Sequence, residues 1–275
     1  RCSSKLMIFP DTTGMSFVLG TTQSDGDSLS SKKQLALAYS NDNAASFKMA
    51  NLPVINQTPR SIATSGSDYV VVGDAGTLLH SSDGINWTQI DVSQYTSSDL
   101  TNVEYLNGKY YVVGDLGYVL SSTNGVNWLS SQVSANPRLM DITYSNGKYF
   151  VVGFGGYIAY SSNASNWIKA TTPNKNQINA IVYGNNMYVA VGAAGTLITS
   201  TNGQQWSVVP QDNIKCSSGS SCQGLTKTLH SVLYDAQDGF VAVGDSGLVL
   251  KSSDGITWLI DAPSTYDYTG ITSLN

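Results

Sequence analysis

Short runs of apolar residues alternate with turn-forming residues along almost the whole chain, and this pattern repeats. A run at 102–105 is followed by Asn107-Gly108, then by Tyr110–Val113, a Gly-x-x-Gly turn and Tyr118–Ser121. Runs rich in β-branched and aromatic residues, separated by such turns, predict strands joined in hairpins. The repeat continues with Ser-x-Asp/Asn-Gly-x-x-Trp, and we expect the Trp to begin a fourth short strand.

The repeat unit is close to forty residues long. Five copies align on their tryptophans, which are separated by 41, 39, 39 and 52 residues: Trp87, Trp128, Trp167, Trp206 and Trp258. A degenerate sixth copy spans 40–47 and places Phe47 at the tryptophan position. Four antiparallel strands per unit of this length predict the blades of a β-propeller. We therefore expect an all-β, six-bladed propeller forming a single domain, 1–275, with blades at 268–275 plus 1–50, 60–91, 100–132, 138–171, 177–209 and 228–261.

The two ends of the chain supply complementary parts of one repeat. Residues 271–275 match 103–107 and then stop, whereas Gly14-Met15-Ser16-Phe17 supplies the continuation. We expect the C-terminal strand to complete the N-terminal blade, which would remove open sheet edges. The alternative is that residues 6–9 form the inner strand of the first blade and that the C-terminal strand begins an incomplete seventh blade.

Composition and charge restrict the classes of partner. Charged residues make up 12% of the chain and the net charge is −5, with the acids scattered, so nucleic acid is not an expected partner. No apolar stretch approaches the roughly 18–20 residues that span a bilayer. We expect a monomer that binds no metal or cofactor, because two histidines cannot build a histidine cluster and the glycine-rich turns open no helix.

The cysteines bear on location. Cys216 and Cys222 flank a Ser/Gly segment that is flexible enough to bring the two thiols together. A disulfide there indicates a secreted or periplasmic protein whose signal peptide has been removed, and two unpaired surface thiols are the alternative. Cys2 has no assigned role.

The turns at 81–87 and 252–258 resemble the Asp-box (BNR) repeat of sialidases and related propellers. The repeat architecture is also similar to that of photosystem II assembly factors, and the resemblance covers nearly the whole chain. It implies that the boxes are structural, with the polar residue holding the turn and the aromatic residue packing between sheets. These residues are Asp42, Phe47, Asp83, Trp87, Asn124, Trp128, Asn163, Trp167, Asn202, Trp206, Asp254 and Trp258.

The resemblance does not extend to sialidase chemistry. A sialidase would be expected to use three arginines and a Tyr-Glu pair, but the arginines here are Arg1, Arg60 and Arg138, and Glu104 is the single glutamate. We therefore assign no catalytic residue. The assembly factors are expected to use an arginine-rich patch, which three arginines cannot build, so the same partner is not implied.

Candidate ligand-binding residues gather where the chain enters each predicted blade. Equivalent Gly-Asp-x-Gly turns place three aspartates at this end, and basic residues lie at or just before the inner strands. Each could equally be a solvated turn residue or a locally paired charge. The set is Arg60, Asp74, Glu104, Asp115, Arg138, His230 and Asp245.

Three functions remain open from the sequence. The first is a non-catalytic secreted or periplasmic scaffold that binds a protein or glycan through the channel-entry face. The second is a glycoside hydrolase or lyase using aspartates on that face, and the third is a lectin whose tyrosines stack on sugars. Variable segments at 21–33, 95–100, 212–226 and 265–268 are expected to decorate the same face.

Overall fold

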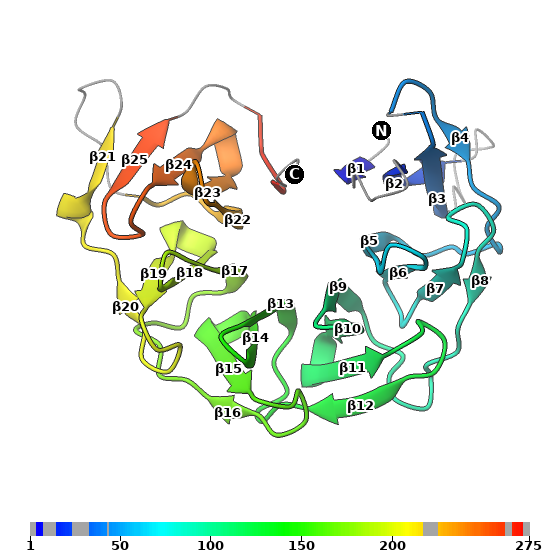
Figure 1. Ribbon diagram of the computed structural model, residues 1–275, viewed down its shortest axis with the longest axis horizontal. Helices are drawn as coiled ribbons and strands as arrows, with labels where there is room; N and C mark the ends of the chain where they lie inside the picture. The colour runs from blue at the N-terminus through cyan, green and yellow to red at the C-terminus, as the bar shows by residue number, and fades with distance from the viewer. Residues whose placement is uncertain are drawn as a thin grey trace. The chain divides into compact units, whose positions relative to one another are not determined.

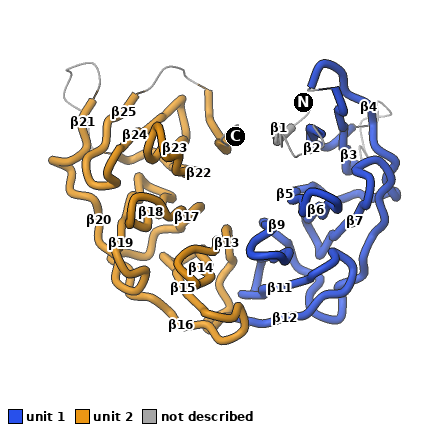
Figure 2. Tube along the Cα trace, in the orientation of Figure 1, with its two compact units in different colours: residues 1–132, 274–275 blue, residues 133–273 orange. Residues whose placement is uncertain are grey.

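The regular elements of the described residues are β-strands and short 3-10 turns. The computed structural model describes residues 4–7, 15–23, 33–42, 44–216, 225–261 and 266–271. These residues contain no helix long and apolar enough to cross a membrane. The strands form six sheets, numbered here 1–6 in chain order, and the chain divides into two compact units (Figures 1 and 2).

The first unit contains sheets 1–3, each with four strands in sequential antiparallel order. Their strands are β1 Ser4–Met7, β2 Ser16–Gln23, β3 Lys33–Ser40 and β4 Lys48–Met49; β5 Pro59–Thr64, β6 Tyr69–Gly73, β7 Leu78–Ser81 and β8 Thr88–Gln89; β9 Leu100–Leu106, β10 Lys109–Gly114, β11 Tyr118–Ser122 and β12 Leu129–Gln132.

The second unit contains sheets 4–6, built on the same antiparallel plan. Their strands are β13 Leu139–Ser145, β14 Lys148–Gly153, β15 Tyr157–Ser161 and β16 Ile168–Lys169; β17 Ile178–Gly184, β18 Met187–Gly192, β19 Leu197–Ser200 and β20 Ser207–Val208; β22 Leu229–Asp235, β23 Gly239–Gly244, β24 Val249–Ser252 and β25 Trp258–Asp261. Sheet 6 has a fifth strand, β21 Ile214–Cys216.

Both faces of the central strands are buried, which explains why their sequences are continuously apolar. In β6, Val71 belongs to the core between sheets 1 and 2, whereas Val70 and Val72 belong to the core between sheets 2 and 3. The box tryptophan expected between sheets is there in sheet 2: the ring of Trp87 lies 6.4 Å from that of Phe17 of β2, measured between centroids. Alternate side chains of one strand therefore pack against the sheets on either side of it.

The hairpin turns form where Asn-Gly predicts them. Asn107 and Gly108 both have positive φ, 48° and 80°, as a two-residue turn between twisted strands requires. Asn146 and Gly147 repeat this conformation in sheet 4 with φ of 49° and 73°. The fourth strands were less well predicted: the strand begins at the tryptophan only in sheet 6, and in the other tryptophan-bearing sheets it begins one residue later.

The inner edge of sheet 1 differs from our main expectation. Ser4–Met7 pairs with β2, with Met7 opposite Phe17 and Ser4 opposite Gly20. This corresponds to the alternative in which an N-terminal segment provides the inner strand. The C-terminal strand expected at 268–275 is not formed by residues 268–271, and residues 272–275 lie outside the described part.

The sequence did not indicate β21. This strand pairs in parallel with β25 and places Ile214 opposite Trp258 and Cys216 opposite Ile260. It covers the outer edge of sheet 6 and adds Ile214 to the core around Trp258. Cys222, the proposed partner of Cys216, lies outside the described residues, so the disulfide stays a prediction.

Candidate functional site

Each sheet has two chemically different ends. The first-to-second hairpin and the Asp box lie at one end. The second-to-third-strand turn lies at the other end, where the first strand begins, and we call this the entry end. In sheets 2–6 the residue in the middle of that turn has positive φ: Ala75, Leu116, Gly155, Ala194 and Ser246.

A glycine before each entry turn allows the incoming chain to pass very close. A Cβ atom on Gly153 would lie 2.1 Å from the carbonyl oxygen of Arg138, the residue before β13. The same oxygen accepts a hydrogen bond from the N–H of Phe154 at 2.9 Å. The first residue of the turn is thus held firmly and presents its side chain at the entry end.

In sheet 2 this arrangement produces a charged cluster. Arg60, the second residue of β5, donates through Nε to the carboxylate of Asp74 and through Nη2 to Asp99 Oδ2 at 3.2 Å. The other oxygen of Asp99 accepts the N–H of Ala75 at 3.0 Å. Arg60 and Asp99 keep 35% and 28% of their side-chain surface exposed, so one guanidinium bridges two carboxylates within reach of solvent.

Sheet 6 repeats the cluster with different chemistry. His230, again the second residue of the first strand, places Nε2 2.6 Å from Asp245 Oδ1. This hydrogen bond holds the pKa of Asp245 below its ordinary range. Asp267 accepts the N–H of Ser246 at 2.7 Å, as Asp99 accepts that of Ala75. The segment at 266–271 therefore contacts the entry turn of sheet 6 in the way that residues 98–103 contact the entry turn of sheet 2.

Sheets 3–5 carry other pairs of residues at these two positions. In sheet 3 Asp115 takes the turn position, but Thr101 replaces the basic residue and donates to the carbonyl of Val113 at 3.0 Å. Sheets 4 and 5 carry Met140 with Phe154 and Asn179 with Ala193 at these two positions. Arg138 lies just before β13, as expected. The entry ends are consequently not equivalent, although the backbone is.

Glu104 lies apart from the turn residues. It sits in β9 opposite Tyr111, and its Oε1 accepts a long hydrogen bond from the side-chain amide of Asn102 at 3.4 Å. Asn102 in turn accepts the hydroxyl of Ser61 in the neighbouring sheet at 2.6 Å. The described contacts of Glu104 tie it to the junction between sheets 2 and 3.

The sequence analysis did not single out two of the candidate residues. Asp99 and Asp267 lie within the variable segments at 95–100 and 265–268, but their reach back to the preceding turn was not anticipated. Their shared position in the repeat was a usable signal, because 267–271 aligns with 99–103 and Asp99 directly precedes β9.

The Asp boxes have the geometry of a closed turn. Asp83 Oδ1 accepts the backbone N–H groups of Ile85 and Asn86 at 2.8 and 2.7 Å, and Ser81 Oγ accepts that of Gly84. Trp87 Nε1 donates to the carbonyl of Gly84 at 3.1 Å. The hydrogen bonds from Asn86 hold the pKa of Asp83 far below its ordinary range.

The remaining boxes vary this plan slightly. Asn124, Asn163, Asn202 and Asp254 each accept two following backbone N–H groups. Asp42 accepts the N–H of Ser46 at 3.0 Å in the longer first box. Phe47 departs from the packing expected at the tryptophan position, since 41% of its surface is exposed.

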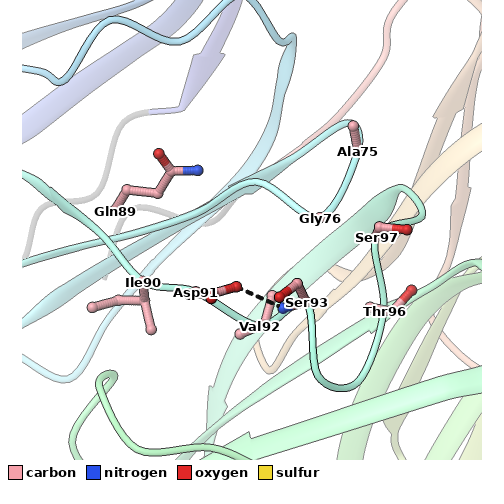
Figure 3. Close-up of a pocket in the computed structure, with 9 residues that line it drawn as sticks. All are labelled: Ala75, Gly76, Gln89, Ile90, Asp91, Val92, Ser93, Thr96 and Ser97. Carbon is pink, nitrogen blue, oxygen red and sulfur yellow. Dashed lines mark hydrogen bonds between the residues drawn. The ribbon is translucent and has the colours of Figure 1, made fainter.

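A cavity of about 410 Å³ opens beside the entry turn of sheet 2 (Figure 3). One wall is the turn itself at Ala75 and Gly76, another is the chain leaving β8 at 89–93, and the third is formed by Thr96 and Ser97. The first wall includes Ala75, whose N–H donates a hydrogen bond to Asp99. The cavity and the Arg60 cluster are therefore parts of one entry end.

The chain was compared with known proteins. The family described as "Photosynthesis system II assembly factor YCF48" matches residues 15–268. A solved structure entitled "YCF48 bound to D1 peptide" is 16% identical with a TM-score of 0.65, covering 94% of this chain and 84% of that chain. YCF48 from Cyanidioschyzon merolae is also 16% identical, with a TM-score of 0.63 and coverages of 94% and 88%.

A more distant structure agrees with these. The WD40 β-propeller domain of Doa1 is 8% identical with a TM-score of 0.64, covering 95% of this chain and 83% of that chain. The comparison with curated proteins gave no match. At such identities the solved structures establish the fold alone, which is that of a β-propeller.

Proposed function

This chain belongs to the photosynthesis system II assembly factor YCF48 family, and from this membership we propose that it is a non-catalytic propeller that binds an extended segment of a partner protein at its entry ends. The family match confirms the expected resemblance to Asp-box propellers and to such assembly factors. One of the similar solved structures is YCF48 bound to a D1 peptide, so a peptide is the ligand class we propose for this chain.

The observation that carries the proposal is the difference between the two ends of the sheets. The Asp-box carboxylates and amides are occupied by their own turns, as Asp83 is by Ile85 and Asn86. The entry ends instead present charged groups on rigid backbone, with Arg60 and Asp99 about one third exposed. Polar groups held on a rigid scaffold are where recognition usually occurs.

The partner chemistry differs from that expected of an arginine-rich patch. Arg60 is the single arginine of its cluster, and it faces both Asp74 and Asp99. The cluster carries one positive and two negative charges, so we propose a partner segment with donor or cationic groups at this position. Electrostatic complementarity of this kind sets specificity more than affinity.

We extend the proposal to organisation and location. We propose six blades in one domain, 1–275, and a monomer; the six sheets of the described residues support the number of blades. A secreted or periplasmic location follows from the predicted Cys216–Cys222 disulfide. Mass spectrometry of thiol-labelled protein with and without reductant tests this pairing; labelling of both cysteines before reduction would contradict it.

The test of the binding function is a peptide array and a glycan array probed with the same purified protein. Peptides from D1 are included, and affinities of the hits are measured by fluorescence anisotropy. We expect saturable peptide binding that Asp245→Ala weakens. Asp238→Ala is the matched control, because it removes the same charge at the opposite end of sheet 6, in the β22–β23 turn.

Two outcomes would overturn the proposal. Saturable glycan binding without peptide binding would favour the lectin or hydrolase alternatives. If Arg60→Ala, Asp74→Ala and Asp245→Ala all leave peptide binding unchanged, the peptide does not bind at the entry ends.

A further inference from the structure

The cavity beside Ala75 has the size of a side-chain pocket. Ligand pockets usually enclose about 300–1,000 Å³, and this cavity, at about 410 Å³, falls at the small end. An occupant of one or two amino-acid residues fits this volume better than a folded surface or a long oligosaccharide. Figure 3 shows its walls converging from three separate parts of the chain, all within the first unit.

The walls are held in place without a ligand. The N–H of Gly76 donates to the carbonyl of Ser98 at 2.7 Å, and the N–H of Thr96 donates to that of Val92 at 3.1 Å. Val92 is 2% exposed and belongs to the core between sheets 2 and 3. Gly76 has φ of +69°, and a Cβ there would lie 3.1 Å from the carbonyl oxygen of Thr96, so the turn and the linker approach closely. A preformed pocket of this kind avoids part of the entropy cost of binding.

The lining is rich in hydrogen-bond acceptors. Asp91 is the one charged residue among the nine labelled in Figure 3, and Ser93, Thr96 and Ser97 contribute hydroxyl groups. Asp91 Oδ1 accepts the N–H of Ser93 at 2.9 Å, and this hydrogen bond lowers the pKa of the Asp91 carboxyl. Ile90 and Val92 add apolar surface, and Ala75, Gly76 and Gln89 complete the lining.

This combination matches a long basic side chain. The aliphatic stem of lysine or arginine packs against apolar groups while its charged end seeks carboxylate and hydroxyl oxygens. An acidic ligand would instead meet Asp91 and, at the neighbouring cluster, a surplus of carboxylate over guanidinium. An uncharged apolar side chain would gain nothing from the charge of Asp91.

We propose that the cavity bounded by Ala75, Asp91 and Ser97 is a specificity pocket for a lysine or arginine side chain of the bound protein segment. The proposal rests on the proposed function, because it assigns one contact of the same ligand. It names the chemistry of that contact, which the family match does not supply.

Small probes test the pocket without any protein partner. Nα-acetyl-lysine amide, Nα-acetyl-arginine amide and the uncharged Nα-acetyl-norleucine amide are titrated into ¹⁵N-labelled protein and followed by NMR. We expect saturable shifts of the Gly76, Ser93 and Ser97 amide signals with the two basic probes, and none with norleucine. Molar salt is expected to weaken binding, because the attraction is screened beyond a few ångströms.

The informative variant is Asp91→Asn, which keeps an oxygen to accept the Ser93 N–H while removing the charge. It is expected to weaken binding of the basic probes about twofold to fivefold, because Asp91 is exposed and the attraction of an exposed charge pair is small. Asp238→Asn is the matched control and is expected to leave the titrations unchanged. Equal shifts with norleucine, or no saturable shift at these three amides, would overturn the proposal.

The two proposals fail in distinguishable ways. If array peptides bind at the entry ends without a preference for lysine or arginine, and bind Asp91→Asn as well as wild type, the basic-side-chain pocket is refuted and the peptide-binding function is not. Basic probes that saturate the three amides support the pocket even before a partner peptide is known.

Discussion

Gly153 and Gly155 lie two residues apart in the entry turn of sheet 4, and alanine at these positions should have very different effects. Gly153 has φ of −179°, an extended conformation that alanine adopts freely. The obstacle there is space, because a Cβ would lie 2.1 Å from the carbonyl oxygen of Arg138. Gly155 has φ of +71°, but nothing lies within 4 Å of the place that a Cβ would take there.

The magnitudes follow from these two situations. At Gly153 the oxygen must move by more than about 1 Å, which breaks its hydrogen bond with the N–H of Phe154 and forces the backbone apart. A lost buried hydrogen bond and overpacking together cost about 3–5 kcal/mol. At Gly155 the cost is the left-handed conformation alone, about 1 kcal/mol. Ala75 and Ala194 already adopt this conformation in the equivalent turns.

Urea unfolding followed by tryptophan fluorescence measures both variants against wild type. We expect Gly155→Ala to lose about 1 kcal/mol and Gly153→Ala at least about three times as much. If the two variants were equally stable, the close approach of the incoming chain to the turn would not be the reason for glycine at position 153.

Two further predictions concern the Asp box and the chain ends. Asp83→Asn should change the free energy of unfolding little at pH 7, and the variant should lose less of its stability than wild type when the pH is lowered. The pKa of Asp83 is depressed in the folded protein, so its carboxylate stabilises the fold above the unfolded-state pKa of 3.8. This contribution disappears as the pH falls toward the folded-state pKa, and asparagine has no such contribution to lose. Urea unfolding at neutral pH and near pH 2.5 checks this, and an equally steep acid loss in both proteins would refute it. Deleting Ser4–Met7 should destabilise the protein more than deleting 268–275, because the first deletion removes the strand paired with β2, whereas the described loss in the second is the hydrogen bond from the N–H of Tyr268 to the carbonyl of Gly244. Thermal unfolding of both variants measures the difference, and greater destabilisation by the deletion of 268–275 would refute β1 as the inner strand of sheet 1.

The fold was largely predictable because its determinants are local and repeated. Continuous apolar runs such as 69–72 reflect strands buried on both faces, and Asn107-Gly108 specifies its hairpin through backbone conformation alone. The parts that were missed depend on partners far away in sequence. Ile214–Cys216 has no strand-forming pattern of its own and is fixed by pairing with β25. Ser4–Met7 is fixed by pairing with β2, and the repeat pattern alone fits residues from either end of the chain to that edge.

The candidate site was predictable only as a set of positions. Aligned repeats identified Asp74, Asp245 and the basic residues at the first strands. They could not show that Arg60 reaches Asp99, because that bond joins the first strand of one sheet to the linker that enters the next. The cavity was also invisible, since its walls come from a turn, a strand end and a linker whose lengths vary between repeats.

The repeat itself indicates where function should be sought. Positions that every repeat shares serve the fold, because each has a structural partner in its own sheet, as Ser81 has in Gly84 and Gly153 in the carbonyl of Arg138. Residues that recognise a ligand are instead expected at positions where the repeats share a backbone conformation but differ in side chain. At the entry ends, the second residue of the first strand is arginine in sheet 2, histidine in sheet 6 and uncharged in sheets 3–5. A ligand that contacts these unlike side chains would bind in one orientation to an otherwise regular scaffold. The cavity beside Ala75, which contains Asp91 and is built in part from a linker of irregular length, lies at the entry end that carries the arginine.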